Sequence, residues 1–385
     1  MNSFELRKFV APEFVFGVDA RQLAGQYARN LGARKALVVT DPGVAAAGWT
    51  ADVTASLDAV HIPHVIFDQV TPNPRAEEVM RGAEVYHQHH CDIIVAVGGG
   101  SPMDCAKGIG IVSSNQRHIL TFEGIDQVTM PMPPLICIPT TGGTAAEVSQ
   151  FAIISNRQEH IKIAIISKAV VPDVALIDPL TLTTMDPFLT ACTGIDALVH
   201  AIEAFVSNAQ SHMTDLHALE AIRLVKRYLQ DCITEPGDVE ARGQLMLASL
   251  EAGLAFSNAS LGAVHAMAHS LGGLLDLPHG QCNAVLLQHV VAFNYGASPE
   301  RFAQVGQALG LDLRGMTTAK QKTAVISDIN SLRQRVGVYH TLSQMGVSRS
   351  DITQLAQNAL HDACMVTNPR RPNQRDIEVV YEEAL

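Results

Sequence analysis

The stretch Asp92-Ile93-Ile94-Val95-Ala96-Val97-Gly98-Gly99-Gly100-Ser101-Pro102 contains the pattern that decides the fold. Its first half is an almost continuous apolar run, which is typical of a strand buried on both faces of a parallel sheet. Three glycines end the run, and Ser101 followed by Pro102 predicts a helix that starts at the proline. Glycines in such a turn let a phosphate approach the N–H groups of a helix N-terminus. The Gly-x-Gly-x-x-Gly fingerprint is absent, so a plain strand-to-helix turn remains the alternative.

Similar apolar runs occur on both sides of this stretch, and helical segments separate them. The alternation predicts an α/β domain with a parallel, Rossmann-like sheet that is covered on both faces. The later runs also allow a hairpin. The predicted strands are Ala36–Thr40, His64–Phe67, Asp92–Val97, Leu135–Ile138, Phe151–Ile154, Lys162–Ile166 and Val174–Ile177.

The pattern changes after Asp186-Pro187, where strand-like runs give way to long segments with helical periodicity. Examples are 215–229 and 240–256. A chain of 385 residues is also too long for one simple core. We therefore predict an α/β dinucleotide-binding domain over residues 1–187 and an all-helical, metal-binding domain over residues 188–385.

Composition excludes several classes of partner. The formal net charge is −11 and no long Lys/Arg run occurs, which argues against nucleic acid and anionic membranes as partners. The N-terminal residues carry charges where a signal peptide needs an apolar stretch, and no apolar run reaches membrane-spanning length. The seven cysteines are scattered without a Cys-x-x-Cys pair, which is typical of reduced thiols. We expect a cytoplasmic protein that acts on a small molecule.

Two further features of the first half have nucleotide-binding and structural interpretations. Thr140-Thr141-Gly142-Gly143-Thr144-Ala145-Ala146-Glu147 follows a predicted strand, and its hydroxyls suit a pyrophosphate or a ribose. The alternative is a helix cap, with Thr144 and Glu147 spaced as a capping box. Asp41 ends an earlier strand, where a carboxylate can accept ribose hydroxyls and favour NAD over NADP. The alternative for Asp41 is a residue of the Asp-Pro-Gly turn.

The second half contains two residue pairs with metal-ligand spacing. Asp196 and His200 are one helical turn apart, as are His265 and His269, and His279 follows a short turn. Their neighbours are small and apolar, and burying ionisable groups there is costly unless they are paired or metal-bound. The predicted site suits iron or zinc. The Glu of a His-Glu-x-x-His protease is missing. By contrast, the His-rich stretch at 87–90 predicts only a solvated helix end.

The chain resembles the iron-containing (group III) alcohol dehydrogenases. The resemblance rests on Gly98–Asp104, Thr140–Glu147, Thr193–Glu203 and Phe256–Gly280, and it extends in order to Thr367–Arg370. Within the family, the ethanol, 1,3-propanediol and lactaldehyde (1,2-propanediol) oxidoreductases are the most similar. The resemblance implies the dehydroquinate synthase-like architecture, with NAD in the cleft between the two domains.

The resemblance also implies a role for individual residues. It implies Asp196, His200, His265 and His279 as metal ligands and His269 as a catalytic residue that relays a proton. Phe151, Phe256 and Cys364 fall around the substrate pocket. The positions that hold NAD are Asp41, Asn73, Gly98, Gly99, Gly100, Ser101, Asp104, Thr140, Thr141, Thr144 and Lys162. The implied activity is hydride transfer between a small primary alcohol or diol and NAD, with Fe²⁺ as the metal and Zn²⁺ as an alternative in isolated protein.

The sequence departs from the family pattern at three places. Gly142 stands where the family usually has Ala, Gln288 stands where close relatives carry Pro, and Phe151 is bulkier than its counterpart in some diol enzymes. The last departure favours a fairly apolar alcohol over a diol. Two alternatives remain, namely a metal-dependent lyase or cyclase like the dehydroquinate synthases and a non-catalytic nucleotide-binding protein. The family also implies a homodimer or a larger homo-oligomer.

Overall fold

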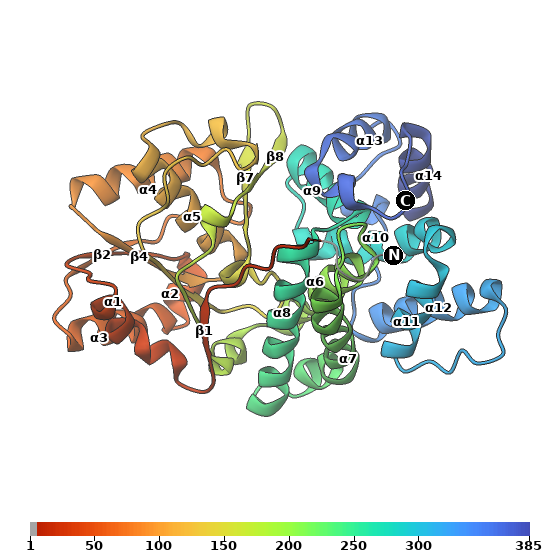
Figure 1. Ribbon diagram of the computed structural model, residues 1–385, viewed down its shortest axis with the longest axis horizontal. Coiled ribbons are helices and arrows are strands. Elements are labelled where there is room, and N and C mark those ends of the chain that lie inside the picture. Colours follow the sequence, from red (N-terminus) through yellow and green to blue (C-terminus); the bar gives the residue numbers. More distant parts are fainter. Residues whose placement is uncertain (1–5) are drawn as a thin grey trace.

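The computed structural model describes residues 6–385 as a sheet-containing half and a helical half that lie side by side (Figure 1). The first half is built on a six-stranded parallel sheet with the strand order β1-β9-β6-β4-β2-β3. The strands are β1 (Glu13–Phe16), β2 (Ala36–Val39), β3 (His64–Phe67), β4 (Ile93–Gly98), β6 (Leu135–Pro139) and β9 (Val174–Ile177). The predicted parallel sheet is confirmed, and β1 is a strand that the sequence pattern missed.

Both faces of this sheet are covered, which explains the continuous apolar runs. Successive side chains of a strand point to opposite faces. Leu37 and Val39 of β2 pack in one cluster with residues of α4 (Ala76–Gln88) and α5 (Gly100–Asn115). Ala36 and Val38 pack in another cluster with residues of α1 (Ala24–Asn30) and α3 (Trp49–Ala59). Each strand residue is therefore buried whichever way it points.

The strand order creates a crevice at the carboxyl edge of the sheet. The chain passes from β2 through α2 (Pro42–Ala46) and α3 to β3, and then through α4 to β4 on the other side of β2. The segments that follow β2 and β4 therefore leave toward opposite faces. Ligands of open α/β sheets bind at such a switch point. Asp41 and Gly98–Gly100 lie on its two sides.

A small three-stranded sheet lies between the large sheet and the helices. Its strands β7 (Phe151–Asn156) and β8 (Ile161–Ile166) form the predicted antiparallel hairpin, and β5 (Gly124–Ile125) pairs parallel with β8. The hairpin packs closely on α9 (Ala263–Leu275). A Cβ at Gly273 would lie 2.8 Å from the Ile161 Cα, so only glycine fits there.

The second half is helical throughout, and α6 (Pro187–Val206) runs through its core. Asp186 caps α6 by accepting hydrogen bonds from the N–H groups of residues 188 and 189, and Pro187 occupies the first helical position. α6 is long and apolar enough to cross a membrane, but 94% of its apolar window is buried inside the protein, as in a core helix. The other helices are α7 (His212–Thr234), α8 (Val239–Ala259), α9, α10 (His279–Asn294), α11 (Pro299–Ala308), α12 (Thr318–Arg335), α13 (Ile352–His361) and α14 (Gln374–Ala384).

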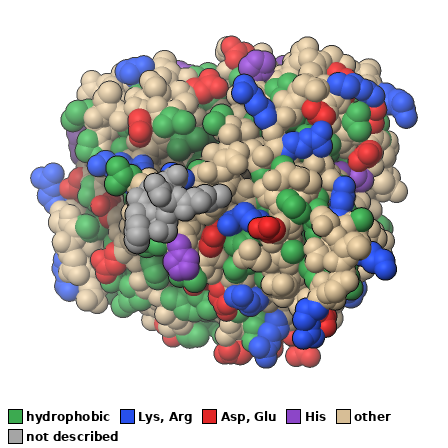
Figure 2. Space-filling view, turned by 45° about the vertical axis from the view of Figure 1, so that its right-hand side comes forward, with side chains coloured by type: hydrophobic (Ala, Val, Ile, Leu, Met, Phe, Trp, Pro, Cys, Tyr) green, Lys and Arg blue, Asp and Glu red, His purple; other side chains and the backbone are tan. Residues whose placement is uncertain are grey.

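Within residues 6–385, the last strand ends at Ile177 and α6 begins at Pro187, where the sequence predicts the change. The N-terminal segment nevertheless crosses to the helical half (Figure 1). The N–H of Val10 donates to Asn258 Oδ1 at 2.7 Å, and Asn258 Nδ2 donates to the Val10 carbonyl at 3.0 Å. The division into domains 1–187 and 188–385 stays a prediction. Acidic and basic side chains are interspersed on the face drawn in Figure 2.

Candidate metal and nucleotide site

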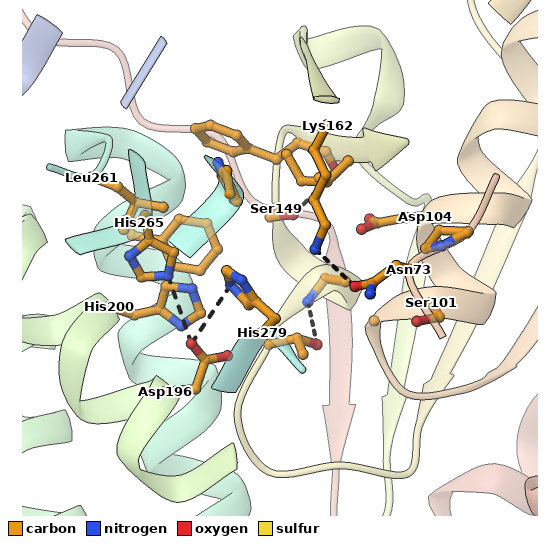
Figure 3. A pocket seen from close by; sticks show the side chains of 18 of the residues that line it. Asn73, Ser101, Asp104, Ser149, Lys162, Asp196, His200, Leu261, His265 and His279 are labelled. Carbon is orange, nitrogen blue, oxygen red and sulfur yellow. Dashed lines mark hydrogen bonds and ion pairs between the residues drawn. The ribbon is translucent and has the colours of Figure 1, made fainter. Parts of the chain in front are cut away.

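One cavity between the halves collects most of the predicted site residues (Figure 3). Phe151 and Phe256, predicted for the substrate pocket, form part of its wall, and their ring centroids lie 5.7 Å apart. The sheet-containing half contributes Asn73, Gly100, Ser101, Asp104, Thr144 and Lys162, and the helical half contributes Asp196, His200, His265, His269 and His279.

Three helices bring the four predicted metal ligands together. Asp196 and His200 lie one turn apart on α6, His265 lies on α9, and His279 is the first residue of α10. Asp196 Oδ1 is 3.7 Å from His265 Nε2 and 3.8 Å from His279 Nε2. The ring of His200 stacks on that of His265 with a centroid distance of 4.4 Å. The ligand atoms of Asp196, His265 and His279 thus lie within 4.8 Å of one another, and the ring of His200 packs beside them on His265.

Hydrogen bonds outside the cluster fix the orientation of two of these imidazoles. His265 Nδ1 donates to Glu203 Oε2 at 2.7 Å, and His200 Nδ1 donates to the Gly143 carbonyl at 3.1 Å. Each ring therefore keeps its Nε2 lone pair for another partner, as metal-bound histidines do. Glu203 also accepts the N–H groups of Gly262 and Val264, at 3.0 and 2.6 Å, and so anchors the start of α9.

The electrostatics of the cluster favour an ionised carboxylate among the imidazoles. Burial tends to raise the pKa of Asp196, but His200 and the other two imidazoles outweigh it and hold that pKa well below its usual range. Burial lowers the pKa of His200 to about 3 and holds that of His279 well below its usual value. At His265 burial lowers the pKa, but the neighbouring carboxylates of Asp196 and Glu203 outweigh it and raise the pKa. One carboxylate with three imidazoles fits divalent iron or zinc.

His269 occupies a different position from the four. Its ring stacks on that of His279 at 5.3 Å, and its Nδ1 donates to Asp362 Oδ2 at 2.8 Å. Asp362 Oδ1 in turn accepts the N–H of Cys364 at 2.8 Å. Cys364 is fully buried beside this pair and is not among the residues that line the cavity, where the sequence predicts it.

The two predicted nucleotide loops pack against each other at the carboxyl edge of the sheet. A Cβ at Gly99 would lie 2.9 Å from Thr141 Cγ2, and a Cβ at Gly100 would lie 3.0 Å from Thr144 Cγ2. The glycines are thus needed for the close approach of the loops. Gly98, Gly99, Thr140 and Thr141 belong to these loops but lie outside the cavity wall, and Gly100, Ser101 and Thr144 line it.

Two details of these loops differ from the prediction. The helix α5 begins at Gly100 with Gly99 as its N-cap, two residues earlier than the predicted start at Pro102. Gly100 and Ser101 already have helical backbone conformations and belong to its first turn. The predicted capping box is wrong. Ala145 with φ of 48° instead precedes a short 3₁₀ turn over Ala146–Val148, and Glu147 is buried.

The remaining predicted NAD residues lie in two places. Lys162 Nζ donates to Asn73 Oδ1 at 2.7 Å inside the cavity. Asp104 lines the same wall, where burial, opposed by Lys107 and Lys162, raises its pKa to about 7. Asp41 lies outside the cavity wall at the end of β2, and its Oδ1 caps α2 by accepting the N–H of Val44 at 2.9 Å. The structure therefore makes Asp41 a helix N-cap rather than a residue of a turn, and its ribose interpretation stays a prediction.

Sequence reasoning missed three residues that contact the site, which are Glu203, Asn283 and Asp362. Glu203 follows Asp196 by seven residues and so lies on the same face of α6, a spacing that could have revealed it. Asn283 follows His279 by four residues on α10, which is a similar signal. Asp362 lies far from His269 in the sequence, and no local pattern marks it.

Comparison with known proteins assigns the family. Residues 11–179 match the family model "Iron-containing alcohol dehydrogenase", and residues 190–385 match "Fe-containing alcohol dehydrogenase family, C-terminal". The chain is 40% identical over 385 residues to a 1,3-propanediol dehydrogenase of Citrobacter freundii, covering 99% of this chain and 100% of that one. It is 36% identical over 377 residues to an NAD-dependent methanol dehydrogenase of Bacillus methanolicus, covering 98% and 99%.

A solved structure of a 1,3-propanediol oxidoreductase is similar over 99% of this chain and 100% of that chain, with a TM-score of 0.96 and 39% identity. The chain therefore belongs to the iron-containing alcohol dehydrogenase family. It is an NAD-linked oxidoreductase of alcohols and aldehydes. Membership favours hydride transfer over the lyase and the non-catalytic alternatives.

Proposed function

We propose that the chain interconverts a small, fairly apolar primary alcohol or diol and its aldehyde, with divalent iron held by Asp196, His200, His265 and His279. The observation that carries this proposal is that one carboxylate and three imidazoles, two of them oriented by hydrogen bonds, line a cavity that the nucleotide loops share. When bound, the iron would supply Lewis-acid polarisation of the alcohol oxygen, and the nicotinamide would supply the acceptor for the hydride.

The chain's own residues bind, orient and move a proton. His269, oriented by its bond to Asp362, takes the proton of the alcohol at its other ring nitrogen, Nε2. Phe151 and Phe256 exclude water from the reacting carbon and limit the size of the substrate. Cys364 contributes indirectly, because its backbone N–H donates to Asp362 and so helps to hold the carboxylate that orients His269.

NAD lies, in this proposal, along the loops at the carboxyl edge of the sheet. The N-terminus of α5 with Gly98, Gly99, Gly100 and Ser101 receives the pyrophosphate. The oxygen of Asp41 that does not cap α2 accepts the ribose hydroxyls and repels a 2′-phosphate. The other contacts come from Asn73, Asp104, Thr140, Thr141, Thr144 and Lys162.

The test is NAD-linked oxidation of a panel of primary alcohols and diols after metal removal and anaerobic reloading with ferrous iron or zinc. Zinc binds such ligands more tightly than ferrous iron, so isolated protein is expected to carry some zinc. The proposal expects activity restored by iron, NAD preferred over NADP, and short apolar alcohols preferred over diols. Metal binding without NADH formation from any alcohol would contradict it.

We further propose a cytoplasmic homo-oligomer. Among residues 6–385, β1 is an edge strand that pairs with β9 alone, and Phe14 and Phe16 on it are 40% and 39% exposed. An edge strand with exposed aromatic side chains favours pairing with another copy. Light scattering measures the molar mass in solution. The proposal predicts at least a dimer for the native chain and a smaller mass for the double variant Phe14→Lys/Phe16→Lys. A monomeric native chain would contradict the proposal.

A further inference from the structure

Asn283 lies in the centre of the candidate metal cluster, although it belongs to none of the predicted ligands. It stands one turn after His279 on α10 and is 0% exposed. Its amide nitrogen is 2.6 Å from Asp196 Oδ1, 3.1 Å from His265 Nε2 and 3.2 Å from His279 Nε2. One amide group thus faces three of the four atoms that would bind the metal.

The orientation of this amide leaves a group unpaired. Asn283 Oδ1 is buried and has no hydrogen-bond partner among the described residues. A buried carbonyl oxygen without a partner carries a free-energy cost. The neighbours explain this orientation of the amide, because the Asp196 carboxylate and the Nε2 lone pair of a neutral His279 can only receive hydrogen bonds. The two N–H groups of the amide therefore face the acceptor atoms of the cluster and donate hydrogen bonds to them.

We propose that Asn283 is a positioning residue that assembles the metal cage before the cation arrives. Its amide holds Asp196, His265 and His279 close together, although their lone pairs repel one another. A bound cation takes the lone pairs of the two imidazoles, and Asn283 then retains its bond to Asp196 and keeps that carboxylate oriented. This inference rests on the proposed function, because it uses the same four ligands.

A purely structural role for Asn283, such as joining α10 to α6, makes a different prediction. Removing a structural hydrogen bond lowers the stability of the protein but leaves the metal affinity of the folded molecules unchanged. Removing a positioning residue of a metal site typically weakens metal binding by about 10- to 100-fold. Metal affinity therefore distinguishes the two roles without measuring catalysis.

The chain offers a matched control at the other end of the same helix. Asn294 is also a buried asparagine of α10, and its amide exchanges hydrogen bonds with Asn368, which is hydrogen-bonded to none of the four ligands. Asn283→Ser and Asn294→Ser therefore remove the same chemical group from the same helix. Only the first change touches the metal ligands.

The experiment measures the dissociation constant of zinc by competition with a chelator, and the visible absorption of the cobalt-loaded protein. Asn283→Ser is expected to raise the zinc constant about 10- to 100-fold and to alter the cobalt spectrum. Asn294→Ser is expected to stay within about threefold of the native protein, which is small on that scale. A folded Asn283→Ser protein with native zinc affinity and an unchanged cobalt spectrum would overturn the inference.

A second variant keeps the inference testable if Asn283→Ser does not fold. Asn283→Asp keeps the shape, removes the donors and adds a negative charge beside Asp196. The melting temperature of the metal-free protein should fall, and zinc should restore it. Equal melting temperatures of the metal-free variant and native proteins would count against the inference. Native zinc affinity in His265→Ala would instead overturn the ligand set itself, and hence the proposed function.

Discussion

Asp196, His200 and Glu203 lie on one face of α6, but their chemical environments differ. The first two point toward the cavity, whereas Glu203 binds the ring of His265 and the first turn of α9. Neighbouring imidazoles likewise differ, because His265 donates to Glu203 and His269 donates to Asp362. Both rings donate to a carboxylate, so what distinguishes them is the place of the second nitrogen: His265 Nε2 lies 3.7 Å from Asp196 Oδ1, and His269 lies outside that group of ligand atoms.

Replacing His265 and His269 separately should separate metal binding from proton transfer. His265→Ala is expected to lose most of its bound metal and its turnover, because it removes a ligand. His269→Ala is expected to keep the metal and lower kcat by about 10²- to 10⁴-fold, the usual contribution of a positioned acid or base. Metal content by elemental analysis and steady-state kinetics test both. A His265→Ala enzyme with native activity would contradict the ligand assignment.

Glu147 should make the stability of the protein depend on pH. It is 2% exposed, and burial, opposed by Lys107, raises its pKa from 4.5 to about 7. Between these values the folded state binds more protons than the unfolded state, so the free energy of unfolding falls as the pH rises from about 4.5 to 7. Glu147→Gln should reduce this slope and stabilise the protein at pH 8 by at most about 3 kcal/mol.

Urea unfolding of Glu147→Gln between pH 5 and 8 measures this effect. Some slope should remain, because burial also raises the pKa of Asp104 to about 7. Glu84→Gln, at an exposed position of α4, is the control and should leave the slope unchanged. A Glu147→Gln protein with the full native slope would show that this carboxyl group is not the cause.

At the scale of elements, the loop after β6 must approach α6 closely to position His200. A Cβ at Gly143 would lie 2.4 Å from the Thr193 backbone carbonyl oxygen, which cannot move aside as a side chain can. The Gly143 carbonyl also accepts the hydrogen bond of His200. Gly143→Ala is therefore expected to destabilise the protein by about 1–3 kcal/mol and to weaken metal binding.

The adjacent glycine provides the control for this prediction. A Cβ at Gly142 would meet the Leu182 Cδ2 at 2.9 Å, which is the end of a flexible side chain. The family usually has Ala at this position, so Gly142→Ala should cost little in melting temperature or metal content. Equal melting curves for Gly143→Ala and the native protein would contradict the packing argument.

The sequence predicts elements well where burial imposes a local pattern. β2 and β4 are buried on both faces, so their apolar runs reveal them. β1 is an edge strand whose side chains are mostly exposed, so its pattern lacks that signal. The same limit applies to the site. Ligand pairs within a helix are visible as i, i+4 spacings, whereas the contact between His269 and Asp362 exists only because α9 and the segment after α13 meet in the folded chain.

At the scale of the whole molecule, the cavity lies between two halves that are joined by hydrogen-bonded contacts. One of these contacts is buried, and another is exposed to solvent. Gln150 binds Ser257 in a buried position, through its N–H to Oγ at 3.1 Å and its Nε2 to the carbonyl at 2.7 Å. Asn73 Nδ2 donates to Asp276 Oδ1 at 2.8 Å in an exposed position, and Arg75 forms a 3.4 Å ion pair with the same carboxylate. The exposed contact of Asp276 with Asn73 and Arg75 can break without exposing the hydrophobic core. It is therefore the contact suited to open when the cofactor enters or leaves the cleft.

Asp276 is expected to tighten cofactor binding while contributing little to stability. Its side chain is 62% exposed, and such contacts contribute about 1 kcal/mol or less. It lies three residues before His279 and holds Asn73, which lines the cavity, so losing it should widen the cleft. If the binding-competent closed form becomes less populated, the apparent dissociation constant of NAD rises in proportion. Asp276→Gly should therefore raise that constant by about fivefold and leave the melting temperature nearly unchanged.

Glycine and asparagine are chosen at position 276 so that loss of the side-chain contact is not confused with strain in the backbone. Asp276 has φ of 53°, a left-handed conformation that glycine and asparagine adopt readily and alanine does not. Asp276→Asn keeps an acceptor for Asn73 and removes the ion pair with Arg75, so its NAD affinity should stay between those of the native protein and Asp276→Gly. Titration of the metal-loaded proteins with NADH, followed by fluorescence, measures all three. If Asp276→Gly binds the cofactor as tightly as the native chain, the contact of Asp276 with Asn73 and Arg75 does not determine the width of the cleft. The buried contact between Gln150 and Ser257 then becomes the one that sets this width.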